Sequence, residues 1–252
     1  MYSVLKTRFS QGTRTVNYPK EPPGLPERFK GLPGIDPSRC GGACALCVEA
    51  CPLNAVIKDR RGVTLDLGKC IFCGACERMC PEKGILFTHE YRMAVRNRRD
   101  LLRTGADRFP LATQLEPDRL KLFRSSLRLR QVSAGGCNAC EADVNVLNTV
   151  VFDLSRFGVQ FVASPRHADG LLVTGPVTKN MELALKKTYE ATPSPKIVIA
   201  SGACAVSGGM FSEHKEAHKG LDEIMPVDLY IPGCPPNPYT ILDGILRLIG
   251  RL

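Results

Sequence analysis

The sequence predicts two domains of different class, a small cysteine-rich α+β domain followed by an α/β domain with a parallel sheet. Three observations predict this. Eight of the twelve cysteines lie within residues 36–88, in two copies of one short pattern. From about residue 126, short apolar runs alternate with helical patterns, which is typical of a parallel sheet. A basic segment with neither pattern separates the two regions.

Composition narrows the class of protein. The chain has 252 residues, 44% of them hydrophobic, and no apolar run approaches the roughly 20 residues that span a bilayer. The first residues lack the apolar core of a secretory signal, so we expect a reducing cytoplasm, where clustered thiols indicate metal binding or catalysis. The net charge of +9 raises the question of nucleic acid, but Trp is absent and no basic aromatic strand occurs, so we expect no nucleic-acid partner.

Two segments carry no cysteine pattern. Residues 1–35 are rich in Pro, Gly and Arg, and we expect an extended arm that lies on a partner. Residues 89–125 form a basic linker in which "RMAVRNRRDLL" is predicted to be helical. This linker is either a solvated helix or a surface that docks an acidic partner chain or anionic lipid headgroups. Its charges, which extend to the first strand of the next domain, are Arg92, Arg96, Arg98, Arg99, Arg103, Arg108, Arg119, Lys121, Arg124, Arg128 and Arg130.

Residues 36–88 hold two tandem cysteine runs, each closed by Cys-Pro. The spacing C-x2-C-x2-C-x3-C-P is typical of bacterial two-cluster ferredoxins, in which the fourth cysteine ligates the other cluster. We therefore predict one [4Fe-4S] cluster on Cys40, Cys44, Cys47 and Cys80, and a second on Cys51, Cys70, Cys73 and Cys76. One extra residue before Cys44 leaves a three-iron cluster open at the first site. Two structural zinc sites are the alternative for both.

Residues 126–252 are predicted to form the α/β domain. Its strands are expected in the apolar runs "LRLRQVSA", "VQFVAS", "GLLVTG", "KIVIAS" and "VDLYIPG". One helical pattern runs through Val144 and Leu154 and stops at Gly158, a second begins after Thr178, and a third begins near Pro238. Strands and helices that alternate in this way predict a flavodoxin-like parallel sheet.

Four more cysteines follow the ends of three of these strands. Because the carboxyl ends of parallel strands share one edge, we expect the four to converge there. Gly would allow close backbone approach to a bulky cofactor, and Pro would fix the loop. A zinc site or a redox dithiol are the alternatives. The candidate ligands are Cys137, Cys140, Cys204 and Cys234, and the flanking candidates are Gly136, Gly202, Gly233 and Pro235.

The motifs "GGCNACE", "SPRHADGLLVTGPVT", "SGACAVSGG" and "YIPGCPPNP" resemble the small subunit of membrane-bound, energy-converting [NiFe]-hydrogenases and the related small subunit of respiratory complex I. Residues 1–88, with "YPKEPPGLPERFKG", resemble the two-cluster ferredoxin subunit of the same complexes. The resemblance implies three [4Fe-4S] clusters that carry electrons to or from a large subunit with a [NiFe] centre. It also implies further electron-transfer and membrane subunits, and a cytoplasmic place at the inner face of the cell membrane.

One detail separates the two relatives. Cys137-Asn-Ala-Cys140 followed by Glu141 is similar to hydrogenases, whereas the complex I subunit carries adjacent cysteines. A nickel-free complex that reduces quinone or another acceptor is the alternative, and a zinc-bearing nucleic-acid-binding protein is a third. All twelve cysteines are assigned, so this chain alone is expected to hold no catalytic centre.

Three polar residues lie beside the expected third cluster. Glu141 either carries a proton or stabilises the start of a helix. Arg166 either raises the cluster's potential or pairs with a carboxylate such as that of Asp169. His167 either couples proton to electron transfer or makes an interface hydrogen bond. Two further histidines, in "SEHKEAHKG", are spaced for a metal, but a solvated polar helix is the preferred interpretation.

Overall fold

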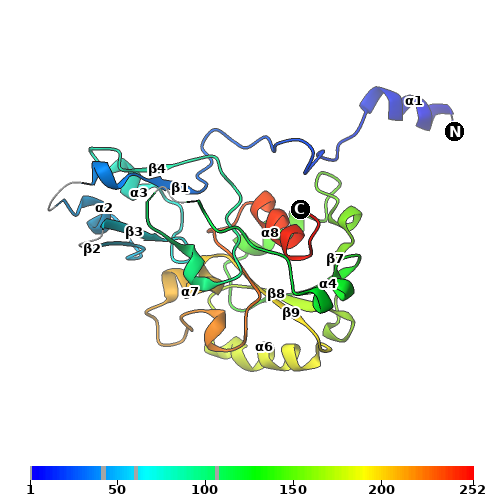
Figure 1. Ribbon diagram of the computed structural model, residues 1–252. Coiled ribbons are helices and arrows are strands. Elements are labelled where there is room, and N and C mark those ends of the chain that lie inside the picture. The colour runs from blue at the N-terminus through cyan, green and yellow to red at the C-terminus, as the bar shows by residue number, and fades with distance from the viewer. Residues whose placement is uncertain (1, 41–43, 60–61, 106–107) are drawn as a thin grey trace.

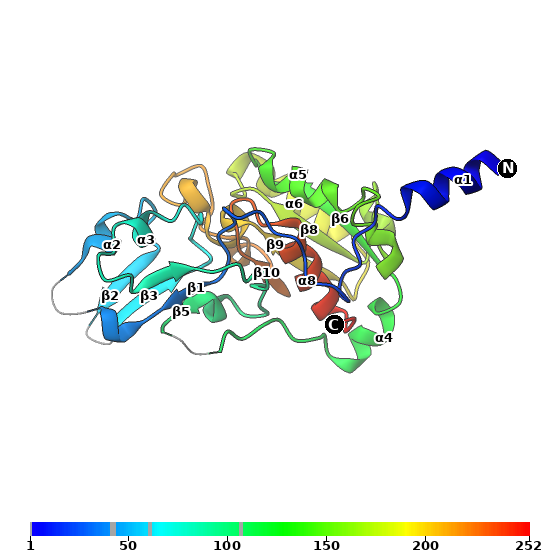
Figure 2. The same cartoon turned by 90° about the horizontal axis from the view of Figure 1, so that it is seen from above.

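The computed structural model describes residues 2–40, 44–59, 62–105 and 108–252. The cysteine-rich region lies at one end of the molecule and the α/β domain at the other, while the N-terminal helix α1 (Tyr2–Gln11) projects beyond the α/β domain (Figures 1 and 2). The fold class predicted from the sequence is therefore confirmed: a small ferredoxin-like region precedes a five-stranded parallel α/β domain.

The cysteine-rich region consists of short elements that hold the cysteine loops between them. Two small antiparallel sheets flank the loops, one of them closed by β5 from the linker. Short helices then place one cysteine of each run on a helical turn. The elements are β1 (Pro33–Ile35), η1 (Pro37–Arg39), α2 (Leu46–Glu49), β2 (Val56–Asp59), β3 (Gly62–Asp66), α3 (Ala75–Arg78), β4 (Ile85–Phe87) and β5 (Leu102–Arg103).

The α/β domain is built on one parallel sheet of five strands in the order β10-β9-β8-β6-β7. If the strands are numbered from β6, this order is the 2-1-3-4-5 order of flavodoxin. The direction in which successive strands are added to the sheet reverses between the first and the third strand. All five strand predictions are confirmed. The strands are β6 (Leu127–Ser133), β7 (Val159–Phe161), β8 (Gly170–Thr174), β9 (Ile197–Ser201) and β10 (Leu229–Ile231).

Helices cover both faces of this sheet. Helices α5 (Ala139–Val146) and α8 (Pro238–Leu248) pack on one face, and α6 (Lys179–Ala191) and α7 (Ala203–Ser207) on the other. The predicted helix starts after Thr178 and near Pro238 are confirmed, and the Asn237 side chain caps α8 by accepting the N–H of Tyr239 at 2.9 Å. The helix predicted to run to Gly158 is wrong in length.

The apolar residues that predicted one long helix belong to two separate elements. α5 stops at Val146, and a separate 3-10 turn, η3 (Leu154–Phe157), carries Leu154 into the core before Gly158 takes a left-handed φ of 72°. The remaining 3-10 turns are η2 (Arg98–Leu101), η4 (Pro165–His167), η5 (Gly209–Phe211) and η6 (Leu221–Glu223).

The arm, predicted to be extended throughout, begins with the exposed helix α1. From Thr15 onward it is extended and lies across the chain's own α/β domain. The N–H of Val16 donates to the carbonyl of Val151 at 2.9 Å, and the hydroxyl of Thr15 donates to that of Val150 at 2.7 Å. Further on, Tyr18 is buried and donates its hydroxyl to Asp243 of α8 at 3.0 Å. The arm then joins the cysteine-rich region through β1. It therefore fastens one domain to the other.

Replacing Tyr18 with alanine is expected to lower the free energy of unfolding by about 3–5 kcal/mol, the usual cost of truncating a buried aromatic side chain. Tyr18 is only 6% exposed and packs against Tyr91 and Tyr239. Denaturant unfolding would measure the loss. Tyr2→Ala is the matched control, because Tyr2 is 83% exposed and its loss should change stability by less than about 0.5 kcal/mol. Equal effects of the two changes would contradict the role of the arm.

The linker is not the predicted helix. Val95 forms an antiparallel bridge with Tyr230 of β10, so this segment lies along the edge of the sheet, and the helix α4 (Pro117–Phe123) begins only later. Its arginines pair largely with acids of the same chain. Three of the contacts, each between 2.6 and 3.0 Å, are Arg98 to Asp66, Arg119 to Asp228 and Arg96 to Glu116.

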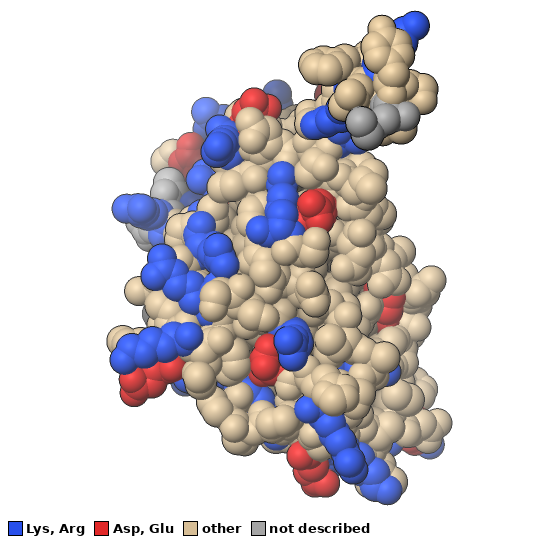
Figure 3. All heavy atoms as spheres, turned by 90° about the vertical axis from the view of Figure 1, so that its right-hand side faces the viewer, with Lys and Arg blue, Asp and Glu red and all other residues tan. Residues whose placement is uncertain are grey.

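Other cations remain at the surface. Figure 3 shows Lys and Arg spread over the side that carries α1 and α4, with fewer acidic residues among them. Lys121, Arg124 and Arg128 are exposed. Within the described ranges, no helix combines the length and the apolar character needed to traverse a bilayer.

Candidate metal centres

The first group of cysteines comes from both runs. Cys40 follows η1, Cys47 lies on α2, and Cys80 follows α3. Burial raises the pKa of the Cys40 and Cys47 thiols, and the charge of Cys80 raises it further. Cys44 and Cys80 also line one open cavity of about 550 Å³ with Cys40. The structure therefore brings these four thiols together. The extra residue of the first run lies in 41–43, outside the described residues.

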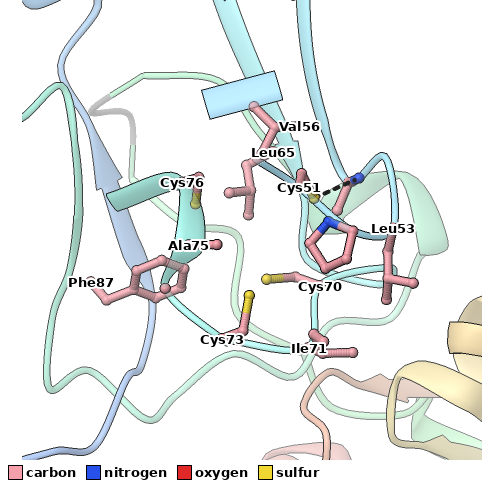
Figure 4. Close-up of a pocket in the computed structure, with 13 residues that line it drawn as sticks. Cys51, Leu53, Val56, Leu65, Cys70, Ile71, Cys73, Ala75, Cys76 and Phe87 are labelled. Atoms are coloured by element: carbon pink, nitrogen blue, oxygen red, sulfur yellow. Dashed lines mark hydrogen bonds between the residues drawn. The ribbon is translucent and has the colours of Figure 1, made fainter. Parts of the chain in front are cut away.

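The second group also combines the two runs. Four sulfurs point toward one space, walled by Leu53, Val56, Leu65 and Phe87 (Figure 4). The cysteines that line this cavity are Cys51, Cys70, Cys73 and Cys76, the set predicted from the sequence to act as ligands of the second cluster.

Burial makes these thiols hard to ionise without a cation. It raises the pKa of Cys70 to about 12, opposed by the N–H of Phe72, which donates to its sulfur at 3.3 Å. It raises the pKa of Cys76 to about 11, with repulsion from Cys51 acting in the same direction. Cysteine ligands bind metal as thiolates, and burial destabilises the thiolate form. A positively charged iron centre would stabilise it.

The third group lies at the carboxyl edge of the parallel sheet. Cys137 follows β6 at the point where the strand order reverses, Cys140 lies on α5, Cys204 on α7, and Cys234 follows β10. Burial raises the pKa of Cys204 to about 11, with repulsion from Cys234 and Cys137 adding to it. Burial also raises the pKa of Cys140, and repulsion from Glu141 and then from the other three cysteines adds to it. The four strand-end cysteines thus converge as the parallel topology requires.

Backbone contacts fix two of these loops to each other. The N–H of Gly202 donates to the carbonyl of Ile231 at 2.9 Å, and the N–H of Ala203 donates to that of Gly233 at 2.8 Å. Gly233 has a φ of 144°, and a Cβ there would lie 2.3 Å from Pro236. Glycine at this position therefore permits the sharp turn that carries Cys234 and Pro235 toward Cys204.

The surroundings of the sulfurs fit an iron–sulfur cluster. Backbone N–H groups donate to thiol sulfur at 3.2 Å, from Ala55 to Cys51 and from Gly84 to Cys80, as cluster thiolates require. A Cβ on Gly209 would lie 2.7 Å from the sulfur of Cys204. Within the described residues, no three His, Cys, Asp or Glu side chains are placed to hold a single metal ion. The thiols converge on a space without forming a closed one-ion site.

Replacing Gly202 with alanine is expected to abolish the third cluster and leave the other two. The φ of Gly202 is +94°, and a Cβ there would lie 2.6 Å from the sulfur of Cys140, so the new side chain is strained and displaces a ligand. Iron analysis with electron paramagnetic resonance would show the loss. Gly24→Ala, with nothing within 4 Å of the added Cβ, is the control. An unchanged third signal in Gly202→Ala would contradict the assignment.

Glu141 lies on the first turn of α5, next to Cys140, and is 7% exposed. Thr174 donates to its Oε1 at 2.6 Å, and its Oε2 is buried with no partner among the described residues. Burial raises the pKa of this carboxyl, but the nearby hydroxyls of Ser133 and Thr174 outweigh burial and leave the pKa below its ordinary value. An added Cβ on Gly136 would meet Oε1 at 2.5 Å, so Gly136 makes room for this carboxylate.

The structure does not bring Arg166 and His167 to the thiols. Both lie on η4, after β7, and are exposed, and no described contact joins either to a cysteine. The alternative pair between Arg166 and Asp169 is wrong, because Asp169 accepts the N–H of Arg128 at 2.7 Å instead and, within the described residues, has no ion pair with Arg166. No contact among the described residues therefore supports tuning of the cluster potential by Arg166 or coupling of proton and electron transfer by His167.

The preferred interpretation of "SEHKEAHKG" as a solvated polar helix is wrong, because neither histidine lies on a helix. Residues 212–216 form turns and a bend, and Ala217 then forms an antiparallel bridge with Thr178. Nε2 of His218 lies 2.9 Å from Glu182 of α6, and the N–H of Glu216 donates to Nδ1 of His214 at 3.2 Å. The two rings therefore take part in separate local contacts.

Sequence reasoning missed several residues around the sites. Thr174 and Ser133 hold Glu141, and Ser207 joins the two domains through the carbonyl of Gly68. Thr174 and Ser207 contact residues far from them in the chain, so no local pattern marks these two contacts. Gly84 could have been found, since it follows Cys80 at the spacing that gives the N–H donor to sulfur.

Comparison with known protein families gives two matches. Residues 137–248 match the family described as NADH ubiquinone oxidoreductase, 20 Kd subunit, and residues 39–85 match the 4Fe-4S dicluster domain. The first match covers the third cysteine group and the second covers the first two groups.

Individual relatives are similar over the same α/β region. The probable membrane-bound hydrogenase subunit mbhJ of Pyrococcus furiosus is 49% identical over 121 residues, 48% of this chain and 72% of that protein. Formate hydrogenlyase subunit 7 of Escherichia coli is 44% identical over 53% of this chain, which spans only 52% of its length. A NADH-quinone oxidoreductase subunit of Citrifermentans bemidjiense is 47% identical over 46% of this chain and 68% of its own length.

Proposed function

Because this chain belongs to the family of the NADH ubiquinone oxidoreductase 20 kDa subunit and also carries a 4Fe-4S dicluster domain, we propose that it relays electrons through three [4Fe-4S] clusters to or from a hydrogenase-type large subunit. The family makes the chain an iron–sulfur subunit of an oxidoreductase. The observation that carries the finer proposal is the convergence of twelve cysteines into three groups of four.

The proposed ligand sets are the three cysteine groups. Bound clusters would supply one-electron oxidation and reduction. The protein's own residues bring four thiols to each site, donate N–H groups to sulfur and keep the second site walled by apolar side chains. No catalytic residue is proposed within this chain.

The groups follow one another in space. Cys47 lies near enough to Cys76 to raise the pKa of the Cys76 thiol, which supports a short distance between the first and second groups. Cys73 and Cys234 line the same cavity of about 370 Å³, which supports contact between the second and third. Electrons would therefore pass from the exposed first site, through the second, to the sheet edge, or in reverse. The large subunit would cover the third site, where Cys137 is exposed.

The complex is proposed to be membrane-bound, with this chain peripheral to the cytoplasmic face. The relative from P. furiosus is named as part of a membrane-bound hydrogenase, and the exposed cations of this chain suit an anionic surface. A nickel-free partner that reduces quinone is the second candidate, favoured by the similarity to the NADH-quinone oxidoreductase of C. bemidjiense.

Purification of the complex with its large subunit distinguishes a hydrogenase-type partner from a nickel-free, quinone-reducing partner. A hydrogenase-type partner is expected to contain nickel and two C-x-x-C pairs in its sequence. A large subunit without both would overturn the hydrogenase assignment and support the nickel-free one. Absence of any iron–sulfur signal in the purified complex would overturn both.

A further inference from the structure

The turn that leads into the second cysteine run is held from two sides. Asp66 is 6% exposed and accepts the N–H of Gly68 on its Oδ1 at 2.9 Å, while its carbonyl accepts the N–H of Cys70 at 3.0 Å. Leu67 is fully buried and donates its N–H to the carbonyl of Leu101 at 2.9 Å. The position of Cys70 therefore depends on the position of this turn.

The linker holds one side of the turn. The guanidinium of Arg98 donates to both carboxylate oxygens of Asp66, at 2.9 and 2.8 Å, in a two-point contact with fixed geometry. The same guanidinium covers Gly68 so closely that an added Cβ would lie 2.6 Å from its central carbon. Arg98 thus fits over the turn as well as pairing with it.

The α/β domain holds the other side. The hydroxyl of Ser207 donates to the carbonyl of Gly68 at 2.9 Å, and both groups are buried. The same hydroxyl lies 3.0 Å from the carbonyl of Ala203, so the two acceptors share its proton. Ser207 closes α7, the short helix that carries Cys204. One hydrogen bond therefore connects the helix of the third group with the turn of the second.

Apolar packing continues across the same contact. A single core contains Cys70 and Cys76 from the cysteine-rich region together with Ala205 and Val206 from α7. Ile71 and Cys73 line the cavity that Cys234 also lines. The second and third groups thus meet here, and the Ser207 bond is a directional contact within an otherwise apolar junction.

We infer that Ser207 and Arg98 are positioning residues that set the separation between the second and third clusters. This rests on the proposed function. The rate of electron tunnelling falls steeply with separation, so a small shift of the turn alters the transfer step without removing a ligand. Apolar burial is non-directional, whereas a buried carbonyl left without its donor costs free energy, which favours a shift of the turn to a position where the carbonyl regains a partner.

Paramagnetic resonance of the fully reduced complex tests the inference. Ser207→Ala is expected to weaken the magnetic coupling between the second and third clusters and to slow electron transfer between them several-fold in freeze-quench experiments. All three cluster signals and the iron content should be retained. Ser207→Thr, which keeps a hydroxyl, is expected to restore the coupling.

Matched controls distinguish a shift of the turn from a general loss of packing in the domain. Ser201 is a buried serine of β9 whose hydroxyl has no partner among the described residues, so Ser201→Ala should leave the coupling unchanged. Arg98→Ala should weaken the coupling as Ser207→Ala does, although it lies on the opposite side of the turn. Its control is Arg99→Ala, because Arg99 is exposed.

Two results would overturn the inference. One is an unchanged coupling and transfer rate in both Ser207→Ala and Arg98→Ala. The other is a shift in the potential of the third cluster alone with the coupling intact, which would give Ser207 a local role near Cys204. In both cases three clusters are still observed, so the proposed function survives. Fewer than three clusters in the unaltered complex would instead refute the proposed function.

Discussion

Cys234→Ser is expected to remove one cluster, about four of about twelve irons, and to leave the signals of the other two clusters intact. Cys234 follows β10 at the sheet edge and belongs to the group with Cys204 and Cys137. The eight cysteines of the first two groups lie in another region with its own small sheets. Loss of Cys234 should therefore leave their ligand sets complete, although the second and third groups adjoin each other.

Iron and sulfide analysis with paramagnetic resonance on anaerobically prepared protein would measure this change. Electron transfer through the chain should also stop, because the third site faces the proposed large subunit. Ser201→Ala on the neighbouring strand β9 serves as the control for damage to the sheet. Loss of all three signals together in Cys234→Ser would contradict the assignment of the third cluster to a ligand set of its own.

Cys51→Ser and Cys80→Ser are each expected to remove the cluster whose other three ligands lie in the opposite cysteine run. Cys51 belongs to the first run but lines the cavity of Cys70, Cys73 and Cys76, so its loss should remove the second cluster. Cys80 belongs to the second run but lines the cavity of the first group, so its loss should remove the first. Either loss interrupts the only proposed route and should abolish transfer between the ends of the chain.

The two signals can be told apart by their surroundings. The first site opens to solvent through a cavity of about 550 Å³, whereas the second is walled by apolar side chains. Relaxation by an added soluble paramagnet should therefore affect the first cluster more strongly. If Cys51→Ser removes the exposed cluster and Cys80→Ser the enclosed one, each run binds its own cluster and the crossed assignment is wrong.

Local patterns predicted most of the fold. The β-strands of the α/β domain are short apolar runs bounded by Gly and Pro, and their burial on both faces is visible in "GLLVTG" and "KIVIAS". Parallel strands also dictated that Cys137, Cys204 and Cys234 share one edge. The crossed grouping of the first eight cysteines followed from spacing alone.

Long-range contacts account for what the sequence could not predict. The linker is rich in helix-forming residues, yet Arg98 pairs with Asp66 and Val95 pairs with Tyr230, and these tertiary contacts outweigh helix propensity. The arm has no core of its own, which is why its sequence predicts a partner. Tyr18 instead enters the core of the α/β domain, where it meets Asp243 from the far end of the chain.

A redox titration of the anaerobically prepared complex, followed by paramagnetic resonance and quantified against total iron, tests the central claim most directly. Three distinct cluster signals, with about twelve irons per chain and no zinc, are expected. Fewer than three centres in fully matured protein, or zinc in place of iron at any of the three cysteine groups, would contradict it.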